Sequence, residues 1–442
     1  MGTKGSEAED QHPMSGIHRL DLSARRQRLV DADMADPDEL SVFDGAGLSA
    51  ESADRMIENA LGTFSLPAGI GVNLRINGVD RVAPMAIEEP SVVAAASHAA
   101  KLLRHGGGIE AHCSEPIVVG QVQLLDVPDP DRAERAIQAA SLELLHLANQ
   151  NHRRLTAAGG GARSLELRRL EPLGPDDPVG PMVVVHLQVD VRDAMGANVV
   201  NTMCETVAPR LEDLSGGRAR LRILTNLCDH RTVTVRGRVP LDRLDRREAA
   251  RGSDLAQGIV EASVFAERDP YRATTHNKGI MNGVDAVLVA AGQDWRAVEA
   301  GAHAYAARNG RYAALARWRV TGEYLHGEMT LPLAVGVVGG VVKVHPGVRT
   351  ALRLGRVRTA SDLAELAAAV GLAQNLGALR ALAGDGIQAG HMRLHARNLA
   401  AEVGAVGSEI DAVSRAMAEA RQYDRDAAQR LLNRLRNERA AP

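Results

Sequence analysis

The hydrophobic pattern between residues 117 and 225 limits the fold more than any other feature, because it switches between strand and helix in a fixed order. It predicts strands at 117 to 126, 164 to 170, 181 to 191 and 218 to 225, with helices at 130 to 157 and 194 to 214. Strand, helix, strand, strand, helix, strand is the order of a split βαβ unit. We therefore expect a small α/β domain inserted into a larger one.

The rest of the chain is expected to form the larger domain and two terminal segments. Residues 1 to 15 are polar and aperiodic, which predicts a flexible tail. After residue 255, helical patterns rich in Ala and Gly dominate. After Gly404 the pattern predicts two amphipathic helices, as either a terminal subdomain or a mobile flap. The predicted class is α+β.

Composition excludes several classes of function. A formal net charge of -3 gives no electrostatic reason to expect nucleic acid or an anionic membrane as partner. The longest apolar runs, such as 331 to 342, are too short and too Gly-rich to span a bilayer, and no signal peptide pattern is present. The cysteines Cys113, Cys204 and Cys228 form neither a zinc pattern nor a disulfide framework, so we expect reduced thiols in a cytoplasmic protein.

Two segments concentrate polar side chains that a plain core would not hold. Glu88 and Glu89 precede Pro90 and Ser91, a sequence that predicts a helix N-terminus. A carboxylate there is normally ionised, so this acid is either a first-turn decoration or a functional group. Residues 269 to 283 hold Arg, His, Lys and two Asn among glycines, which favours a loop that carries chemistry over a plain surface turn.

Three further segments leave structure and function open. Asp294 lies in a turn, where a lone Asp is more often a helix cap than a catalyst. His391 and His395 share a helix face without a third ligand nearby, so we expect no metal site. Residues 190 to 198 run from a strand into a helix N-terminus that can hold a phosphate, although no GxGxxG motif follows any strand.

Seven strings, in this order, resemble the class II, or bacterial-type, 3-hydroxy-3-methylglutaryl-coenzyme A reductases. The resemblance covers nearly the whole chain beyond the N-terminal tail. The strings are MIENALGTF at 56 to 64, EEPSVVAAAS at 88 to 97, VDVRDAMGANVVNTM at 189 to 203, DPYRATTHNKGIMNG at 269 to 283, GQDWRAVEAGAHAYA at 292 to 306, VGLAQNLGALRALA at 370 to 383 and GHMRLHARN at 390 to 398.

The resemblance implies a fold and an assembly. Such enzymes have a large mixed substrate domain, here 16 to 114 with 230 to 384, interrupted by a ferredoxin-like dinucleotide-binding domain, here 115 to 229. A helical C-terminal flap, here 385 to 442, closes over the site. The family forms homodimers or higher homo-oligomers with active sites at the subunit interface, and ENALG at 58 to 62 matches its dimer-interface motif.

The implied activity interconverts (S)-3-hydroxy-3-methylglutaryl-coenzyme A and (R)-mevalonate plus coenzyme A by two hydride transfers, without a metal. The matching catalytic residues are Glu89, Lys278, Asp294 and His391. Lys278 would stabilise the negative charge that develops on a carbonyl oxygen, with Asp294 orienting its ammonium. Glu89 would donate a proton, which requires burial and a neighbouring carboxylate. His391, with His395 as the fallback, would protonate the departing thiolate.

The resemblance also implies binding residues. Asn282 would bridge to Glu89, while Arg272 and Ser91 match positions that hold the distal carboxylate of the substrate. In the small domain, the positions that match dinucleotide contacts are Asp193, Met195, Gly196 and Asn198.

Cofactor choice depends on the first helix of the small domain. Members that use NADH carry an acid there to bond the ribose 2'-hydroxyl, and the matching position here is His152, with Arg154 two residues on. Two potential cations suit a 2'-phosphate, so NADPH is favoured and NADH stays possible. The alternative is that these residues are only a solvated helix end.

The sequence allows three hypotheses about the function. The first is the reductase, run either toward mevalonate or, with NAD, in the catabolic direction; the sequence leaves this direction open. The second is a non-catalytic paralogue that binds coenzyme A esters, which would require loss of a catalytic residue, and none is lost. The third, an unrelated dehydrogenase, is disfavoured by the strings EEPS and THNKGIMNG, which lie outside the dinucleotide domain.

Overall fold

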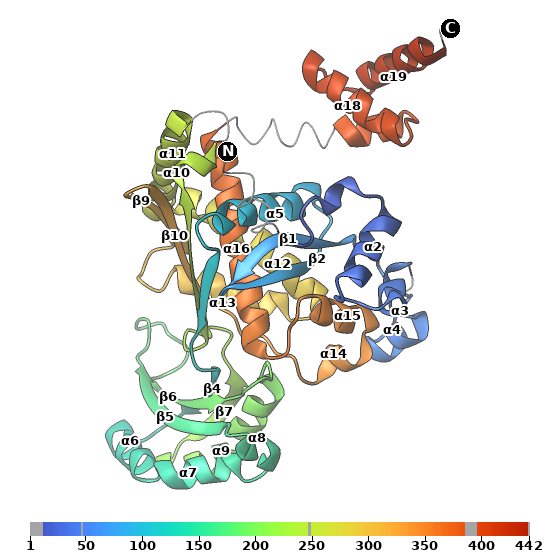
Figure 1. The fold of residues 1–442 in the computed structure, drawn as a ribbon. Coiled ribbons are helices and arrows are strands. Elements are labelled where there is room, and N and C mark those ends of the chain that lie inside the picture. Colours follow the sequence, from blue (N-terminus) through green and yellow to red (C-terminus); the bar gives the residue numbers. More distant parts are fainter. Residues whose placement is uncertain (1–11, 46, 246–248, 385–395, 441–442) are drawn as a thin grey trace.

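The strands of the protein form two separate sheets. The computed structural model describes residues 12–45, 47–245, 249–384 and 396–440. Six strands follow the order β2-β1-β3-β8-β10-β9, and four follow the order β5-β6-β4-β7 (Figure 1). The four-stranded sheet comes from one continuous stretch of chain between β3 and β8. The protein is therefore a mixed α+β protein, as the sequence predicted.

The large unit contains the six-stranded sheet and the longest helices. Its strands are β1 (Ala68–Ile76), β2 (Val79–Ala86), β3 (Ile109–Cys113), β8 (Thr232–Pro240), β9 (Ala316–Thr321) and β10 (Tyr324–Pro332). Its helices after β2 are α5 (Pro90–Arg104), α10 (Leu241–Leu244), α11 (Ala249–Arg268), α12 (Pro270–Ala290), α13 (Trp295–Ala306), α14 (Gly340–Val344), α15 (Pro346–Leu354) and α16 (Ala360–Ala383). The strands β9 and β10 lie in a region where the sequence predicted mainly helix.

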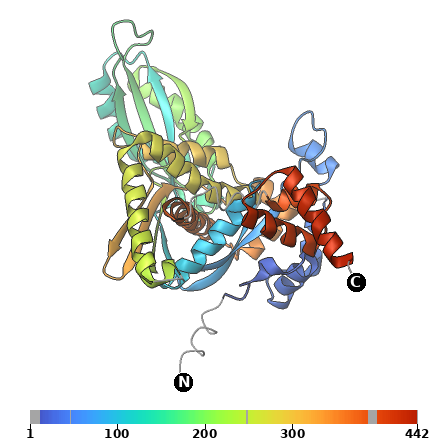
Figure 2. The ribbon, with the colours of Figure 1, turned by 90° about the horizontal axis from the view of Figure 1, so that it is seen from above.

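The helix α16 is the core of the large unit. Figure 2 looks along α16 and shows it enclosed by the other elements of this unit. It packs chiefly against α12 and α5, and most of its side chains are buried. Among the described residues it is the one helix long and apolar enough to cross a membrane, and 67% of that apolar window is buried. Such burial is what the central helix of a globular fold requires.

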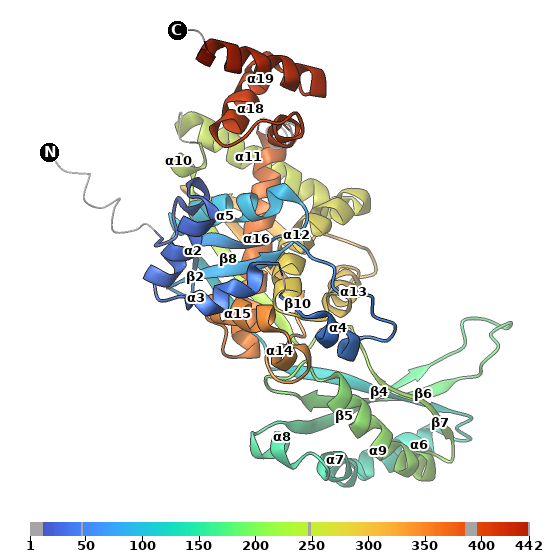
Figure 3. The same cartoon turned by 90° about the vertical axis from the view of Figure 1, so that its right-hand side faces the viewer.

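The small unit covers one face of its sheet with helices. The strands β4 (Ile117–Leu125), β5 (Gly161–Leu170), β6 (Met182–Asp190) and β7 (Arg218–Leu224) are all antiparallel to their neighbours. The helices are α6 (Pro130–Ala139), α7 (Ser141–Asn149), α8 (Arg153–Ala157) and α9 (Ala197–Ser215), on the face turned away from the large unit (Figure 3). Alternate strand residues and these helices bury a separate hydrophobic core.

The single helix predicted from 130 to 157 is three shorter helices, α6, α7 and α8. A side chain at the end of α7 explains one of the breaks. The amide of Asn149 accepts a hydrogen bond from the backbone N–H of Ala162 at 2.9 Å and donates one to its carbonyl at 3.2 Å. This pairing fixes the end of α7 to the start of β5, so the chain turns there instead of continuing as a helix.

The segment 269 to 283, predicted as a loop, is the first two thirds of α12. The carboxylate of Asp269 caps this helix by accepting from the N–H of Arg272 at 3.0 Å, and Pro270 occupies the first turn. The glycines in this segment allow α12 to pack closely against a neighbouring helix, and they do not form a turn. A Cβ on Gly283 would lie 2.9 Å from Cβ of Gln374 on α16. The concentration of polar residues therefore belongs to a helix packed against the core.

The terminal segments agree only in part with the sequence predictions. The helices α18 (Ser408–Ala420) and α19 (Arg425–Ala440) confirm the two amphipathic helices, and they share a small apolar core. Near the other end, Met14 is buried and His12 bonds the carbonyl of Arg81 at 3.0 Å, so residues 12 to 15 are packed and not part of a flexible tail. The remaining elements before β1 are η1 (Ile17–Arg19), α2 (Leu22–Asp31), α3 (Pro37–Leu40), η2 (Ser41–Phe43) and α4 (Ala50–Met56).

Candidate active site

Four of the predicted site residues meet where α12 passes the N-terminus of α5. Glu89 is the N-cap residue of α5, yet its carboxylate does not cap the helix. Its Oε2 lies 3.5 Å from Nζ of Lys278 and accepts from Nδ2 of Asn282 at 3.4 Å. Its Oε1 accepts from Oγ of Ser91 at 3.2 Å. Residues 189 and 193 positions apart in the sequence thus surround one carboxylate.

The spacing along α12 explains this convergence. Lys278 and Asn282 are four residues apart and therefore project from the same side of the helix. The Lys278 side chain is 64% exposed and that of Glu89 is 32% exposed, so water screens their ion pair. An exposed pair at this distance contributes little to stability. Lys278 can therefore turn its ammonium toward another oxygen at small energetic cost.

The electrostatic environment of Glu89 differs from the prediction in one respect. The predicted role as a proton donor requires a second carboxylate beside Glu89, whereas its charged contact in the structure is the Lys278 ammonium. The N-terminus of α5 adds further positive potential at the same point. The site thus combines one acid, one cation and one amide within hydrogen-bonding reach of each other.

Arg272 lies in the first turn of α12 with a half-buried side chain. Burial lowers the pKa of its guanidinium from the ordinary value. Within the described part of the chain, this guanidinium forms no ion pair, and the hydrogen bond from Arg272 to Asp269 comes from the backbone N–H. A half-buried cation without a carboxylate partner is available to an anionic ligand.

Asp294 is not brought to Lys278. It is the N-cap of α13, where its Oδ1 accepts from the N–H of Ala297 at 3.2 Å and lies 3.3 Å from Nη2 of Arg296. Twelve residues of α12 separate Lys278 from the end of that helix, which is about 18 Å along its axis. Within one chain, Asp294 therefore serves as a helix cap and does not orient the Lys278 ammonium.

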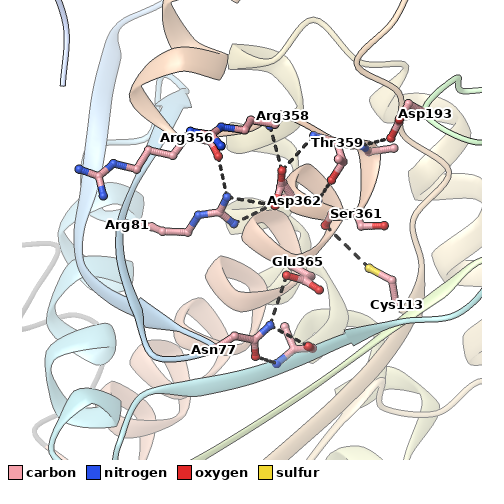
Figure 4. Close-up of polar contacts among 12 residues, drawn as sticks. Asn77, Arg81, Cys113, Asp193, Arg356, Arg358, Thr359, Ser361, Asp362 and Glu365 are labelled. Atoms are coloured by element: carbon pink, nitrogen blue, oxygen red, sulfur yellow. Dashed lines mark hydrogen bonds and ion pairs between the residues drawn. The ribbon is translucent and has the colours of Figure 1, made fainter.

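The loop before α9 is fixed against the large unit. The Oδ1 of Asp193 accepts from the N–H of Ala360, the first residue of α16, at 2.8 Å (Figure 4). The carbonyl of Asp193 accepts from the N–H of Val337 at 2.9 Å. Gly196, with φ of 107°, turns the chain into α9, whose N-terminus has no side-chain cap. The first N–H groups of α9, beside Met195 and Asn198, therefore have no side-chain cap.

Arg231 supports this loop and was missed by the sequence analysis. Its buried guanidinium donates to the carbonyls of Ala194 at 3.0 Å, Met195 at 3.3 Å, Arg192 at 3.4 Å and Val335 at 2.6 Å. Burial lowers the pKa of Arg231 from the ordinary value. A single Arg before a strand carries no recognisable sequence signal, because its role depends on carbonyls that are distant in the sequence.

The predicted cofactor-selecting residues behave differently from each other. Arg154 is exposed on α8. His152 is the N-cap residue of α8, and burial lowers the pKa of its imidazole below the ordinary 6.5. Its Nε2 is buried without a hydrogen-bond partner in the structure. This lowered pKa favours the uncharged imidazole at neutral pH, which leaves Arg154 as the permanent cation of the two predicted residues.

The remaining predicted residues concern the C-terminal flap and a possible metal site. His391 and the fallback His395 lie outside the described residues. In the described ranges, no group of three or more His, Cys, Asp or Glu side chains is placed to hold a metal ion. Cys113, Cys204 and Cys228 are free, and burial raises the pKa of their thiols to about 11, 12 and 11. These thiols stay protonated at neutral pH.

The site brings a cation, an acid and an amide to one point, and the neighbouring unit has an uncapped helix N-terminus. These features suit a nicotinamide-dependent oxidoreductase that acts on a carbonyl group. A family model described as hydroxymethylglutaryl-coenzyme A reductase matches residues 22–396. The chain belongs to this family.

Relatives and solved structures give the same result. The chain is 44% identical over 423 residues to the 3-hydroxy-3-methylglutaryl-coenzyme A reductase of Archaeoglobus fulgidus, covering 96% of this chain and 94% of that protein. A reductase structure from Streptococcus pneumoniae is similar with a TM-score of 0.81 and 39% identity, covering 96% of this chain and 99% of the other. A class II reductase from the same organism, bound to NADPH in open conformations, has a TM-score of 0.79 at 40% identity, covering 94% and 100%. The chain is of the class II type.

Proposed function

We propose that the chain reduces (S)-3-hydroxy-3-methylglutaryl-coenzyme A to (R)-mevalonate and free coenzyme A. The observation that carries this proposal is the contact of Lys278 and Asn282 with Glu89 at the N-terminus of α5. NADPH supplies the hydride for each of two reduction steps. Each step places negative charge on a carbonyl oxygen, which a positioned ammonium stabilises by several kcal/mol. A proton must then reach that oxygen.

The roles of the substrate-side residues follow from their contacts. Lys278 turns its exposed ammonium to the carbonyl oxygen, and Glu89 beside it gives that oxygen a proton. Asn282 holds the carboxyl group of Glu89 through its Nδ2. Arg272, which has no carboxylate partner in the described chain, binds the distal carboxylate of the substrate together with Ser91.

Two catalytic residues act from elsewhere. We assign Asp294 to an active site completed across a homodimer interface, because within one chain it cannot reach Lys278. Exposed apolar side chains in and just after the ENALG motif support such a dimer, since Leu61 and Phe64 are 106% and 93% exposed. His391, with His395 as the fallback, protonates the departing thiolate from the C-terminal flap at 385 to 442.

The small unit is proposed to bind the dinucleotide. Its strand order β5-β6-β4-β7 and its covering helices support a ferredoxin-like domain at 115 to 229, set within a substrate domain at 16 to 114 and 230 to 384. The uncapped start of α9 holds a phosphate, with Met195, Gly196 and Asn198 beside it and Asp193 anchoring the loop. NADPH is favoured because a similar structure binds it, with Arg154 as the available cation; NADH stays possible. We place the enzyme in the cytoplasm.

The test is the initial rate with the thioester, followed as oxidation of NADPH and of NADH in parallel. We expect two reduced cofactors to be oxidised for each coenzyme A released. Lys278→Ala should abolish turnover in folded protein, whereas Lys343→Ala, a change at an exposed lysine in α14, should leave it unchanged. Protein that binds the thioester and oxidises neither cofactor would be a non-catalytic paralogue. Faster oxidation of mevalonate with NAD and coenzyme A would assign the catabolic direction.

A further inference from the structure

A connected row of polar side chains lies along the seam between α12 and α13. Asn277, fully buried on α12, donates from Nδ2 to Oη of Tyr312 at 3.0 Å. The Oη of Tyr312 is 2.7 Å from Nδ1 of His303, and Nε2 of His303 is 2.5 Å from Oε2 of Glu299. Beyond Glu299, on α12, lies Asp285. None of these five residues has a role in the reaction as described above.

The anchor at Asn277 fixes the direction of every hydrogen bond in the row. Its Oδ1 accepts from the N–H of Leu315 at 2.9 Å and its Nδ2 also donates to the carbonyl of Ala313 at 3.0 Å, so the amide cannot be turned over. Because the oxygen of Tyr312 accepts from this amide, its own O–H donates to Nδ1 of His303. The remaining N–H of the imidazole is then on Nε2 and donates to Glu299.

Glu299 therefore acts as an acceptor, and this leaves Asp285 with the proton. The Oδ1 of Asp285 is buried and has no donor among the described residues, because the group it faces is another carboxyl. Two adjacent carboxyl groups form a hydrogen bond only when they share a proton. Burial and the negative charge of Glu299 raise the pKa of Asp285 to about 8. At neutral pH, Asp285 is thus a carboxylic acid that donates to Glu299.

The position of Asp285 connects this row to the active site. Asp285 follows Lys278 by seven residues and Asn282 by three, so all three project from one side of α12. Asn282 contacts Glu89, and residues three apart on a helix are neighbours on its surface, so Asp285 lies next to a residue that touches Glu89. At the other end of the row, Glu299 and His303 are partly exposed to solvent.

We propose that Asp285, Glu299 and His303 return a proton to Glu89 after each reduction step. The inference rests on the proposed reductase activity, in which each hydride forms a C–H bond and the carbonyl oxygen takes a proton from Glu89. Glu89 then regains a proton from Asp285 through water, and Asp285 regains one from solvent through His303 and Glu299. Two protons are consumed for each thioester reduced, because the intermediate of the first step loses its hydroxyl proton when the thiolate departs, and this offsets the proton that the thiolate takes. Asp285 is a positioning residue in this scheme, since it acts through Glu89.

Few other groups can influence this titration. Glu299 on α13, with His303 behind it, is the charged group that faces Asp285. Helices α5, α11, α15 and α16 and strand β2 also pack against α12, and within the described chain none of their charged groups acts on Asp285. The pH dependence of turnover should therefore follow this pair.

The experiment compares Asp285→Asn and Glu299→Gln in the full-length enzyme, with NADPH oxidation measured from pH 6 to 10. The asparagine of D285N still donates to Glu299 but cannot pass a proton. We expect kcat to fall at least about tenfold with both KM values unchanged, and the decline of wild-type kcat above pH 8 to disappear. E299Q removes a neighbouring negative charge, so Asp285 should lose its proton at lower pH and the decline should move to lower pH.

Glu365→Gln is the matched control. Glu365 on α16 is also a half-buried carboxyl whose pKa burial raises, but it bonds Asn77 and not the seam (Figure 4). This variant should keep the wild-type kcat and pH profile.

The outcomes separate the two proposals. An inactive wild-type enzyme would refute the reductase assignment itself. Active wild type with D285N of unchanged kcat and pH profile would refute the proton supply alone. If D285N does not fold, the pH profile of E299Q decides. A decline of kcat that stays at the wild-type pH or moves to higher pH in E299Q overturns the inference.

Discussion

At the scale of single residues, the buried face of α12 carries polar groups that bond to side chains of distant elements. Nε2 of His276 accepts from Nδ2 of Asn375 at 3.1 Å, because the Oδ1 of Asn375 accepts from the indole N–H of Trp318 at 2.8 Å. His276 is 2% exposed. Burial, and then the nearby Arg272 charge, lower the pKa of His276 to about 4. The imidazole is therefore neutral in the folded protein at any pH where the enzyme is expected to work.

This burial predicts a specific loss of stability in acid. Above pH 6.5 the imidazole is neutral in both folded and unfolded protein, whereas between pH 6.5 and 4 only the unfolded chain binds the proton. The free energy of unfolding should fall by about 3 kcal/mol over that range from this residue alone. Urea unfolding at several pH values would measure it. His276→Gln should remove most of this pH dependence, and His112→Gln, at an exposed histidine, should not.

At the scale of elements, the sequence predicted some features well and others badly for identifiable reasons. The strands of the small unit were placed within a few residues, because β4 and β6 are runs of mainly apolar residues that are buried or half-buried. The helix α12 was taken for a loop, because His276 and Asn277 occupy buried positions where the helical pattern expects apolar residues. Only their partners, Asn375 and Tyr312, explain the burial, and these lie far along the chain.

Two glycines of α12 predict opposite effects of the same substitution. A Cβ on Gly283 would be 2.9 Å from Cβ of Gln374 and 3.1 Å from the carbonyl oxygen of Val370, so Gly283→Ala must push α12 away from α16. Overpacking of this kind costs about 1–3 kcal/mol, which exceeds the gain of about 1 kcal/mol in helix propensity. A Cβ on Gly279 would meet only Cβ of Ala378 at 3.9 Å.

Gly279→Ala should accordingly stabilise the protein by up to about 1 kcal/mol, while Gly283→Ala destabilises it. Thermal and urea unfolding of the two variants beside the wild type would measure both changes. Equal effects of the two substitutions would mean that close packing of α12 on α16 is not what requires glycine at 283.

At the scale of the whole molecule, the features hidden from the sequence are those that join distant segments. The large sheet pairs β3 with β8 through Ile109 and Gly237, on either side of the small unit, and no local pattern indicates that register. The candidate site also joins segments that are distant in the sequence. The seven strings identified Glu89, Lys278 and Asn282 through the resemblance, but neither their contact nor the support from Arg231 can be deduced from spacing.

The oligomeric state of the protein is a property that the structure of one chain does not contain, and it can be tested. Leu61 and Phe64 are 106% and 93% exposed, in a segment without helix or strand, and they contribute nothing to the core of their own chain. Phe64→Asp should therefore leave the folding of the chain unaffected while placing a charge in the proposed dimer interface. A hot-spot loss of about 2 kcal/mol or more would raise the dimer Kd roughly 30-fold. Because Asp294 does not reach Lys278 within one chain, turnover should fall with the dimer fraction.

Sedimentation and activity measured at matched protein concentrations would check this prediction. Leu173→Asp is the control, because Leu173 is equally exposed, at 101%, but lies in the connection between β5 and β6. That variant should stay dimeric and active. If F64D sedimented as the wild type does and kept full turnover, the apolar segment would not be the interface. If it became an active monomer, the site would be complete in one chain, and Asp294 would have to reach Lys278 by a rearrangement of α13.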